Sequence, residues 1–211
     1  MLLNILIASS LLLSKCGAGV HPDTLNAIIE VESNHNTLAI YDNTTGTSYR
    51  PLSKEQAIYF TEILLSAGHS IDIGLMQINS LHLKKLNINY KNLFDPCYNV
   101  GIGTKILTDF YQEHASKNPS DKPDVTLLKA LSSYNTGSPH RGKKYVQKIL
   151  KAAGKSTKVP IAAEYANKEP NSISFFKKRE QGMGQKGQNR RTKYGRQDKE
   201  LCPTQSLPKL F

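Results

Sequence analysis

Apolar residues recur at helical spacing along the first three-quarters of the chain. Leu25, Ile28 and Ile29 fall on one face of a segment that begins at Pro22, a residue suited to the first position of a helix. Glu32 follows Leu25 by seven residues, which places it on the same face. The pattern therefore predicts a helix over residues 22–32 whose last turn directs a carboxylate toward the core side.

The same periodicity predicts further helices, each with a start or stop signal. Ser53 and Gln56 form a capping box for a helix that Gly68 can end. Another helix begins at Asp95-Pro96, and its predicted inward stripe contains Cys97, Val100, Thr104, Leu107 and Tyr111. Two later helices are predicted over residues 124–134, followed by Gly137, and over residues 145–153, followed by Gly154.

Strands occupy a smaller part of the prediction. Residues 34–52 are rich in Asn, Thr, Gly and Tyr, which favours loops and a short hairpin. Residues 71–78 form a short apolar run that suits either a strand or an extended loop. The predicted fold class is α+β, mostly α, with a small β element.

Periodicity ends at Gly154, and residues 155–211 are dominated by Lys, Arg, Gln, Asn and Gly. This composition predicts a disordered basic tail. The formal net charge of the chain is +11, which implies a polyanionic partner such as an acidic wall polymer, a membrane surface or nucleic acid. Aromatic residues are sparse in the tail, so nucleic-acid binding is the least favoured of the three.

The first 15 residues are largely apolar and too short to span a bilayer, which predicts a signal leader and an exported, non-transmembrane domain over residues 16–154. A buried N-terminal helix is the alternative. The three cysteines allow one disulfide in an exported protein. No spacing of Cys or His suits a zinc site, so no metal is predicted.

Glu32 is the candidate for chemistry. A glutamate on an apolar face is either paired with a cation in the core or left unpaired with a raised pKa, as a general acid requires. Neither Lys nor Arg occurs within one helical turn of Glu32 in the sequence, and this favours the second interpretation.

Three segments occur in a suggestive order: Glu32-Ser33, Gly74-Leu-Met-Gln-Ile-Asn79 and Ser133-Tyr-Asn-Thr-Gly137. Together they resemble the lysozyme-like lytic transglycosylase (SLT) domain. The resemblance implies that Glu32 is the catalytic acid and that Tyr134 lies near its carboxyl group, where it is a suitable hydrogen-bond partner. It implies substrate contacts for Ser33, Gly74, Leu75, Met76, Gln77, Asn79, Tyr134 and Asn135.

The segments Val20-His-Pro-Asp-Thr-Leu25 and Phe94-Asp-Pro-Cys-Tyr-Asn99 narrow the resemblance to transglycosylases attached to type IV secretion and conjugation machines. This implies a periplasmic enzyme that opens peptidoglycan locally and has other secretion components as partners. It also implies a disulfide between Cys16 and Cys97, with Cys202 left free.

The implied reaction needs one carboxyl group and no cofactor. Glu32 protonates the oxygen between N-acetylmuramic acid and N-acetylglucosamine, then accepts the proton of the muramic C6 hydroxyl, which closes a 1,6-anhydro ring. Asp72 leaves a second chemistry open, because two carboxyl groups in one cleft are typical of a hydrolytic lysozyme. A third alternative is a scaffold role in the secretion apparatus.

Overall fold

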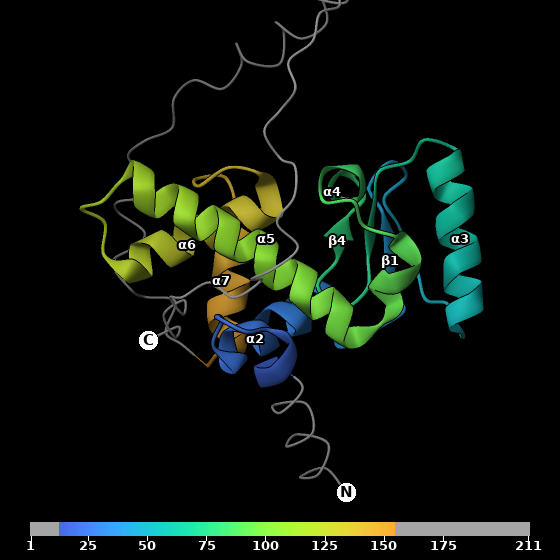
Figure 1. Ribbon diagram of the computed structural model, residues 1–211, viewed down its shortest axis with the longest axis horizontal. Coiled ribbons are helices and arrows are strands. Elements are labelled where there is room, and N and C mark those ends of the chain that lie inside the picture. Colours follow the sequence, from blue (N-terminus) through green and yellow to red (C-terminus); the bar gives the residue numbers. More distant parts are fainter. Residues whose placement is uncertain (1–12, 155–211) are drawn as a thin grey trace, which may run out of the picture.

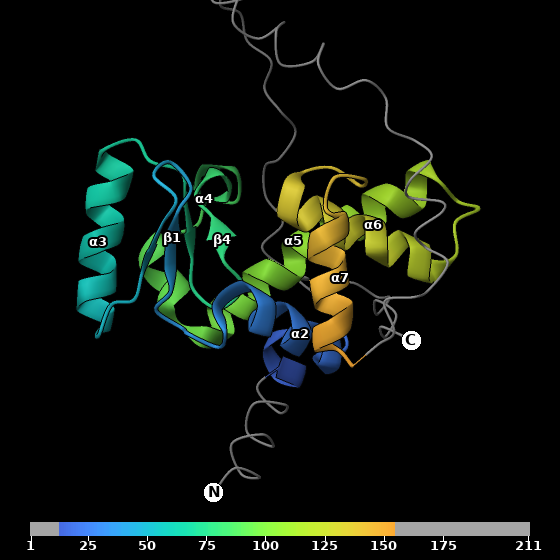
Figure 2. The ribbon, with the colours of Figure 1, turned by 180° about the vertical axis from the view of Figure 1, so that it is seen from behind.

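A long helix, α5 (Pro96–Lys117), connects a group of helices with a small sheet in the computed structural model, which describes residues 13–154 (Figure 1). The helical group contains α2 (Pro22–Ser33), α6 (Pro123–Thr136) and α7 (Lys143–Ala152). On the other side, α3 (Lys54–Ser66), α4 (Leu81–Lys85) and the 3₁₀ helix η1 (Tyr90–Phe94) accompany the sheet. The view from behind shows α7 alongside α2 (Figure 2).

The sheet has four short antiparallel strands in the order β2-β1-β3-β4. Their bounds are Ile40–Asp42 for β1, Thr47–Tyr49 for β2, Ile71–Ile73 for β3 and Ile78–Asn79 for β4. Ile40 pairs with both Tyr49 and Ile73, so β1 is an inner strand. The predicted hairpin within residues 34–52 is confirmed, and residues 71–78 form two strands joined by a tight turn.

Capping explains where the helices begin and end. Asp95 accepts a hydrogen bond from the amide of Tyr98 at 2.8 Å, and Ser53 accepts one from the amide of Gln56 at 3.2 Å. Gly137 follows α6 in the left-handed conformation, with φ of 66°, and its amide donates to the carbonyl of Ser133. The helices together with the four-stranded sheet confirm the predicted class, which is mostly helical with a small β element.

The core lies where these elements meet. The side chains that are less than 2% exposed come from both sides of α5, and the largest are Leu25, Ile28, Ile40, Ile71, Ile73, Met76, Ile78, Leu93, Leu107, Leu127, Leu128 and Leu131. One expectation is corrected: Cys97 is exposed at the start of α5, although its spacing placed it on the inward stripe. Cys97 lies on the outer side of the first turn of α5, whereas Asn99 and Val100, two and three residues later, are buried.

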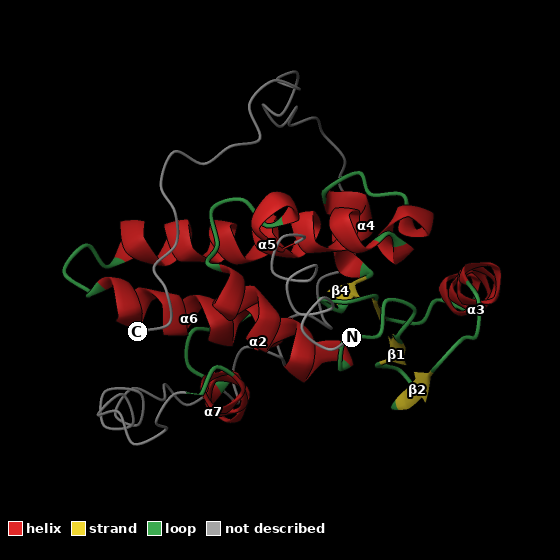
Figure 3. Ribbon diagram, turned by 90° about the horizontal axis from the view of Figure 1, so that it is seen from below, coloured by secondary structure: helices red, strands yellow, loops and turns green. Residues whose placement is uncertain are grey.

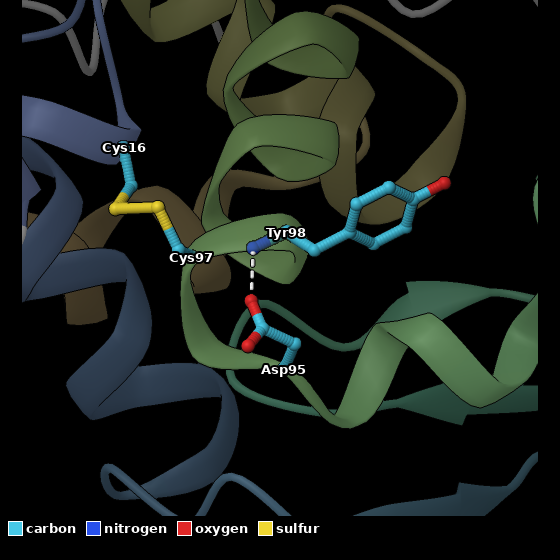
Figure 4. Close-up of a disulfide and its surroundings, with 4 residues drawn as sticks. All are labelled: Cys16, Asp95, Cys97 and Tyr98. Carbon is cyan, nitrogen blue, oxygen red and sulfur yellow. Dashed lines mark hydrogen bonds between the residues drawn. A yellow bond between two sulfur atoms is a disulfide. The ribbon is translucent and has the colours of Figure 1, made fainter.

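A disulfide joins Cys16 to Cys97, with their Cα atoms 5.1 Å apart (Figure 4). The predicted pairing is thus present, and it ties the segment before α2 to the first turn of α5. Leu13, in the helical turn before Cys16, is 4% exposed and packs in the core. Residues 1–12 of the predicted leader, the predicted tail and Cys202 lie outside the described residues. No helix within residues 13–154 is long and apolar enough to cross a membrane.

Candidate active site

Two hollows of about 430 and 660 Å³ adjoin one another across the surface between the sheet and the helices. We call the smaller one the α4 hollow, because Leu81 and His82 of that helix line it. The larger one is the α7 hollow, which Tyr145 and Lys148 line. Five residues line both hollows and mark the place where they meet: Glu32, Asn43, Asp72, Gln77 and Asn135.

Glu32 reaches this junction because α2 ends directly after it. Asn34 adopts a left-handed conformation with φ of 51°, and its amide closes the helix on the carbonyl of Glu30. The apolar face of α2 buries Leu25 and Ile28 completely, which leaves Glu32, one to two turns further on, half-buried at the edge of the core. The predicted placement of this carboxyl group is correct.

Only one of the two Glu32 carboxyl oxygens has a hydrogen bond within the described residues. The hydroxyl of Tyr145, on α7, donates to Oε1 at 2.6 Å. The other oxygen, Oε2, is left for the cleft. This differs from the expectation for Tyr134, whose hydroxyl donates to the carbonyl of Met76 at 2.7 Å instead. The two tyrosines come from different helices, and Tyr145 lies 113 residues beyond Glu32 in the sequence.

Burial raises the pKa of Glu32 from 4.5 to about 7. The hydrogen bond from Tyr145 opposes this rise, the negative charge of Asp72 adds to it, and the positive charge of Lys148 lowers the pKa slightly. The sequence suggested a carboxyl group remote from cations, yet the fold brings Lys148 near, one turn after Tyr145 on α7. At neutral pH the carboxyl group is therefore divided between its protonated and ionised forms, which suits a group that must both give and take a proton.

Asp72 lies on β3 and is held by two amides. The Nδ2 atom of Asn43 donates to its Oδ2 at 2.9 Å, and that of Asn79 donates to its Oδ1 at 2.6 Å. Burial raises the pKa of Asp72, and both hydrogen bonds oppose the rise. Asn79 also accepts the amide of Leu81 at the start of α4, so its side chain ties the end of the sheet to the α4 hollow.

Asn99 of α5 holds the turn between β3 and β4 on its buried side. Gly74 has φ of 78°, and a Cβ there would lie 2.2 Å from Nδ2 of Asn99, so this position requires glycine. The buried Asn99 side chain accepts the amide of Met76 at 2.8 Å and donates to the carbonyls of Ile73 and Leu93. Leu75 and Met76 are 6% and 0% exposed.

Gly74, Leu75 and Met76 therefore line neither hollow, in contrast to the substrate contacts implied for them. They support the wall of the cleft from the core side. Gln77, at the end of the same turn, does face the cleft. Its Nε2 donates to the carbonyls of Gly74 and Ala39, while Oε1 has no partner within the described residues.

The remaining predicted residues lie around the same junction. Ser33 lines the α7 hollow, and its hydroxyl donates to the carbonyl of Ile29 within α2. Tyr134 and Asn79 line the α4 hollow, and Asn135 is exposed at the meeting point of the two hollows. The fold thus gathers Glu32 with five of the eight other predicted residues: Ser33, Gln77, Asn79, Tyr134 and Asn135.

Residues 13–157 match the family model of the transglycosylase SLT domain. The chain belongs to the SLT family. Its SLT domain is 37% identical over 141 residues to the protein virB1 of Agrobacterium fabrum, a match that covers 66% of this chain and 56% of that protein. The chain is 32% identical over 170 residues to the type IV secretion system protein virB1 of Brucella abortus, with 77% of this chain and 71% of that protein covered.

The invasion protein IagB of Salmonella typhimurium is 36% identical to this chain over 111 residues, which cover 44% of the chain and 63% of IagB. No solved structure matches the chain. The match to the Agrobacterium protein spans a little over half of that protein's length, so the family assignment concerns the SLT domain and not the residues outside it.

Two residues of the SLT domain that shape the site were not predicted from the sequence as site residues. Tyr145 was assigned to the core face of its helix, and it is indeed 7% exposed, but its hydroxyl emerges at Glu32. Asn99 lies in a segment that carried the family resemblance, and its polar side chain inside an apolar stripe was the available signal. Within residues 13–154, no group of three His, Cys, Asp or Glu side chains is arranged to hold a metal ion.

Proposed function

We propose that this protein is a peptidoglycan lytic transglycosylase that cleaves the bond between N-acetylmuramic acid and N-acetylglucosamine and leaves 1,6-anhydro ends. The observation that carries the proposal is the half-buried Glu32 of an SLT domain, with a pKa near 7, at the meeting point of two hollows. The two hollows together offer an extended cleft that suits a linear polymer, with the acid in the middle.

In the first step, protonated Glu32 donates its proton to the glycosidic oxygen, and the bond from that oxygen to C1 of the muramic residue breaks. Tyr145 holds Oε1 at 2.6 Å, which fixes the carboxyl plane and leaves Oε2 to carry the transferred proton. Burial and the charge of Asp72 favour the protonated form before the step.

In the second step, the ionised Glu32 accepts the proton of the muramic C6 hydroxyl while that oxygen forms a bond with C1. The proton and the electron pairs balance, and the enzyme returns to its starting state without consuming water. The Tyr145 hydrogen bond, which favours the carboxylate, stabilises Glu32 between the two steps. One carboxyl group thus serves in turn as acid and base.

The residues around the acid are suited to orient the sugars. Gln77 offers its free Oε1 to a hydroxyl or an acetamide N–H, and the exposed Asn135 offers an amide on the facing wall. Leu81, Ile106 and Phe110 give the α4 hollow apolar surface for sugar rings.

The hydrolytic alternative would use Asp72 to activate water. Both of its oxygens accept amide hydrogens at 2.6 and 2.9 Å, and this favours a role in holding Asn43 and Asn79 and in raising the pKa of Glu32. Mass spectrometry of digested wall separates the two chemistries. We expect anhydro-muramic ends from the wild type, none from Glu32→Gln, and anhydro ends still from Asp72→Asn. Reducing muramic ends, or an Asp72→Asn variant as inactive as Glu32→Gln, would contradict the proposal.

We further propose that the enzyme acts in the periplasm for a type IV secretion or conjugation apparatus, which the names of the virB1 relatives support. The scaffold alternative is tested by complementation of a deletion strain. Loss of machine assembly with Glu32→Gln would tie assembly to wall cleavage, whereas normal assembly with a variant that does not clear wall in a zymogram would favour the scaffold.

A further inference from the structure

The α7 hollow contains two cations that come from different elements of the fold. Arg50 follows β2 directly, and Lys148 lies on α7. Figure 3 shows β2 and α7 on the same side of the molecule, with α2 between them. Both side chains are exposed and line the same hollow as Glu32, which lies at its inner end.

Neither cation is used by the fold. Lys105, Lys117 and Lys129 are each paired with an Asp or Glu, but no ion pair among residues 13–154 includes Arg50 or Lys148. Glu30 lines the same hollow and is also outside these pairs. Besides Glu32 and Asp72, the hollow therefore presents two cations and one carboxylate, that of Glu30, that belong to no ion pair within residues 13–154.

The position of Lys148 is distinct from that of its neighbours on α7. Lys144 and Lys151 are exposed and lie one turn before and one turn after Lys148 on the same face of the helix, yet neither lines the α4 hollow or the α7 hollow. Lys148 lies three residues after Tyr145, on the side that faces Glu32, and its charge is felt at that carboxyl group. Of these three lysines, only Lys148 lines the hollow that also contains Glu32 and Arg50.

The α4 hollow differs in charge. Its cation, Lys85, also lines a small pocket that contains Asp109 and Glu113, so acidic groups surround it. The two halves of the cleft are therefore unlike: one combines apolar surface with a cation near acidic groups, and the other is mainly polar with unpaired cations.

We propose that Arg50 and Lys148 bind the carboxylates of the peptide attached to muramic acid, so that the protein prefers peptide-bearing glycan to bare glycan. This rests on the proposed function, because cleavage at a muramic residue puts the lactyl group and its peptide beside Glu32. The peptide carries free carboxylates and, in many walls, an ammonium group. Two cations with Glu30 beside them match that set of charges.

The test measures binding apart from cleavage. Short soluble glycans, either with their peptides or stripped of them by an amidase and with the lactyl carboxylates that the amidase exposes converted to amides, are titrated calorimetrically into the full-length Glu32→Gln protein. Arg50→Gln and Lys148→Gln are added singly and together, with Lys144→Gln as the matched control on α7. Because Glu32 is replaced, the effect of Lys148 on its ionisation does not enter the result.

We expect each single variant to lower the preference for peptide-bearing glycan by about two- to fivefold and the double variant by about tenfold, the range for exposed charge pairs. The effect should shrink as salt is raised, and Arg50→Lys should restore part of the preference. Lys144→Gln should keep the preference of the parent protein.

An unchanged preference in the double variant, with normal thermal unfolding, would overturn the proposal. So would an equal loss of binding for both glycans, because the two residues would then contact the sugars themselves. The proposed function fails by a separate readout, which is the absence of anhydro-muramic ends from wild-type digests of either substrate.

Discussion

The hydrogen bond between Tyr145 and Glu32 makes a prediction that a simple loss of activity does not. Replacing Tyr145 by Phe removes the hydroxyl that lies 2.6 Å from Oε1 and keeps the ring in the core. The hydroxyl lowers the pKa of Glu32 against the effect of burial, so its loss should raise that pKa further. The same change frees the carboxyl plane to rotate, which should slow catalysis at every pH.

The magnitude follows from the strength of the bond. A hydrogen bond to a charged group contributes about 1.5–3 kcal/mol, and if roughly half of this favours the ionised over the protonated form, the pKa rises by about one. With a wild-type pKa of about 7, about a tenth of the enzyme is protonated at pH 8, against about half in the variant. If positioning costs about tenfold at acid pH, the loss at pH 8 is only about twofold.

The assay is kcat on short soluble glycans between about pH 5 and pH 9, for the wild type and Tyr145→Phe. Activity should fall as pH rises through the pKa of Glu32, and this alkaline limb should move up by about one pH unit in the variant. Tyr134→Phe is the matched control, because its hydroxyl bonds to Met76 and its removal should leave the limb in place. A limb that stays fixed or moves to lower pH in Tyr145→Phe would refute the reasoning.

Four further predictions concern the two carboxyl groups, the tail and the disulfide. Glu32→Gln should stabilise the fold by about 1–2 kcal/mol at pH 8 and little at pH 4. The reason is that the raised pKa of Glu32 makes the stability of the wild type fall as pH rises from about 4.5 through about 7. An equal gain in melting temperature at both pH values would contradict this. Asp72→Asn should shift the alkaline limb of kcat to lower pH, because the charge that helps keep Glu32 protonated is lost; an upward shift would contradict it. A chain truncated after Gly154 should cleave short soluble glycans normally and bind wall sacculi less tightly at low salt, and misfolding of the truncated chain would defeat the idea. Reducing the bond between Cys16 and Cys97 should lower the free energy of unfolding in urea by about 2–4 kcal/mol, and an unchanged transition midpoint would contradict its stabilising role.

The position of Glu32 was predictable because it depends on local rules. A proline start, an apolar stripe and a stop after Ser33 fix both the helix and the face on which the carboxyl group lies. The same holds for the helix that begins at Pro96. The short helices α4 and η1 were not predicted, since segments of five residues contain too few turns to show a period.

The partners of Glu32 were less accessible to sequence reasoning. Tyr145 comes from the last helix, and its distance from Glu32 depends on the packing of α2 against α7, which no local pattern specifies. For Met76 the motif did signal importance, but the buried Asn99 binds the backbone amide of Met76, and the Met76 side chain lies in the core. A motif therefore indicated which residues matter without indicating the direction in which each one points.

The bond between Cys16 and Cys97 spans 81 residues of sequence, and both Glu32 and Asp72 lie inside the loop that it closes. A bond of this kind forms in oxidising compartments and stays open in the reducing cytosol. If the enzyme acts in the periplasm, as proposed, the ring that contains the acid closes only after the chain has crossed the inner membrane, and the oxidising machinery there takes part in the enzyme's maturation. If a leader is removed, cleavage must occur before Cys16, because the mature chain needs Cys16 to form the bond with Cys97.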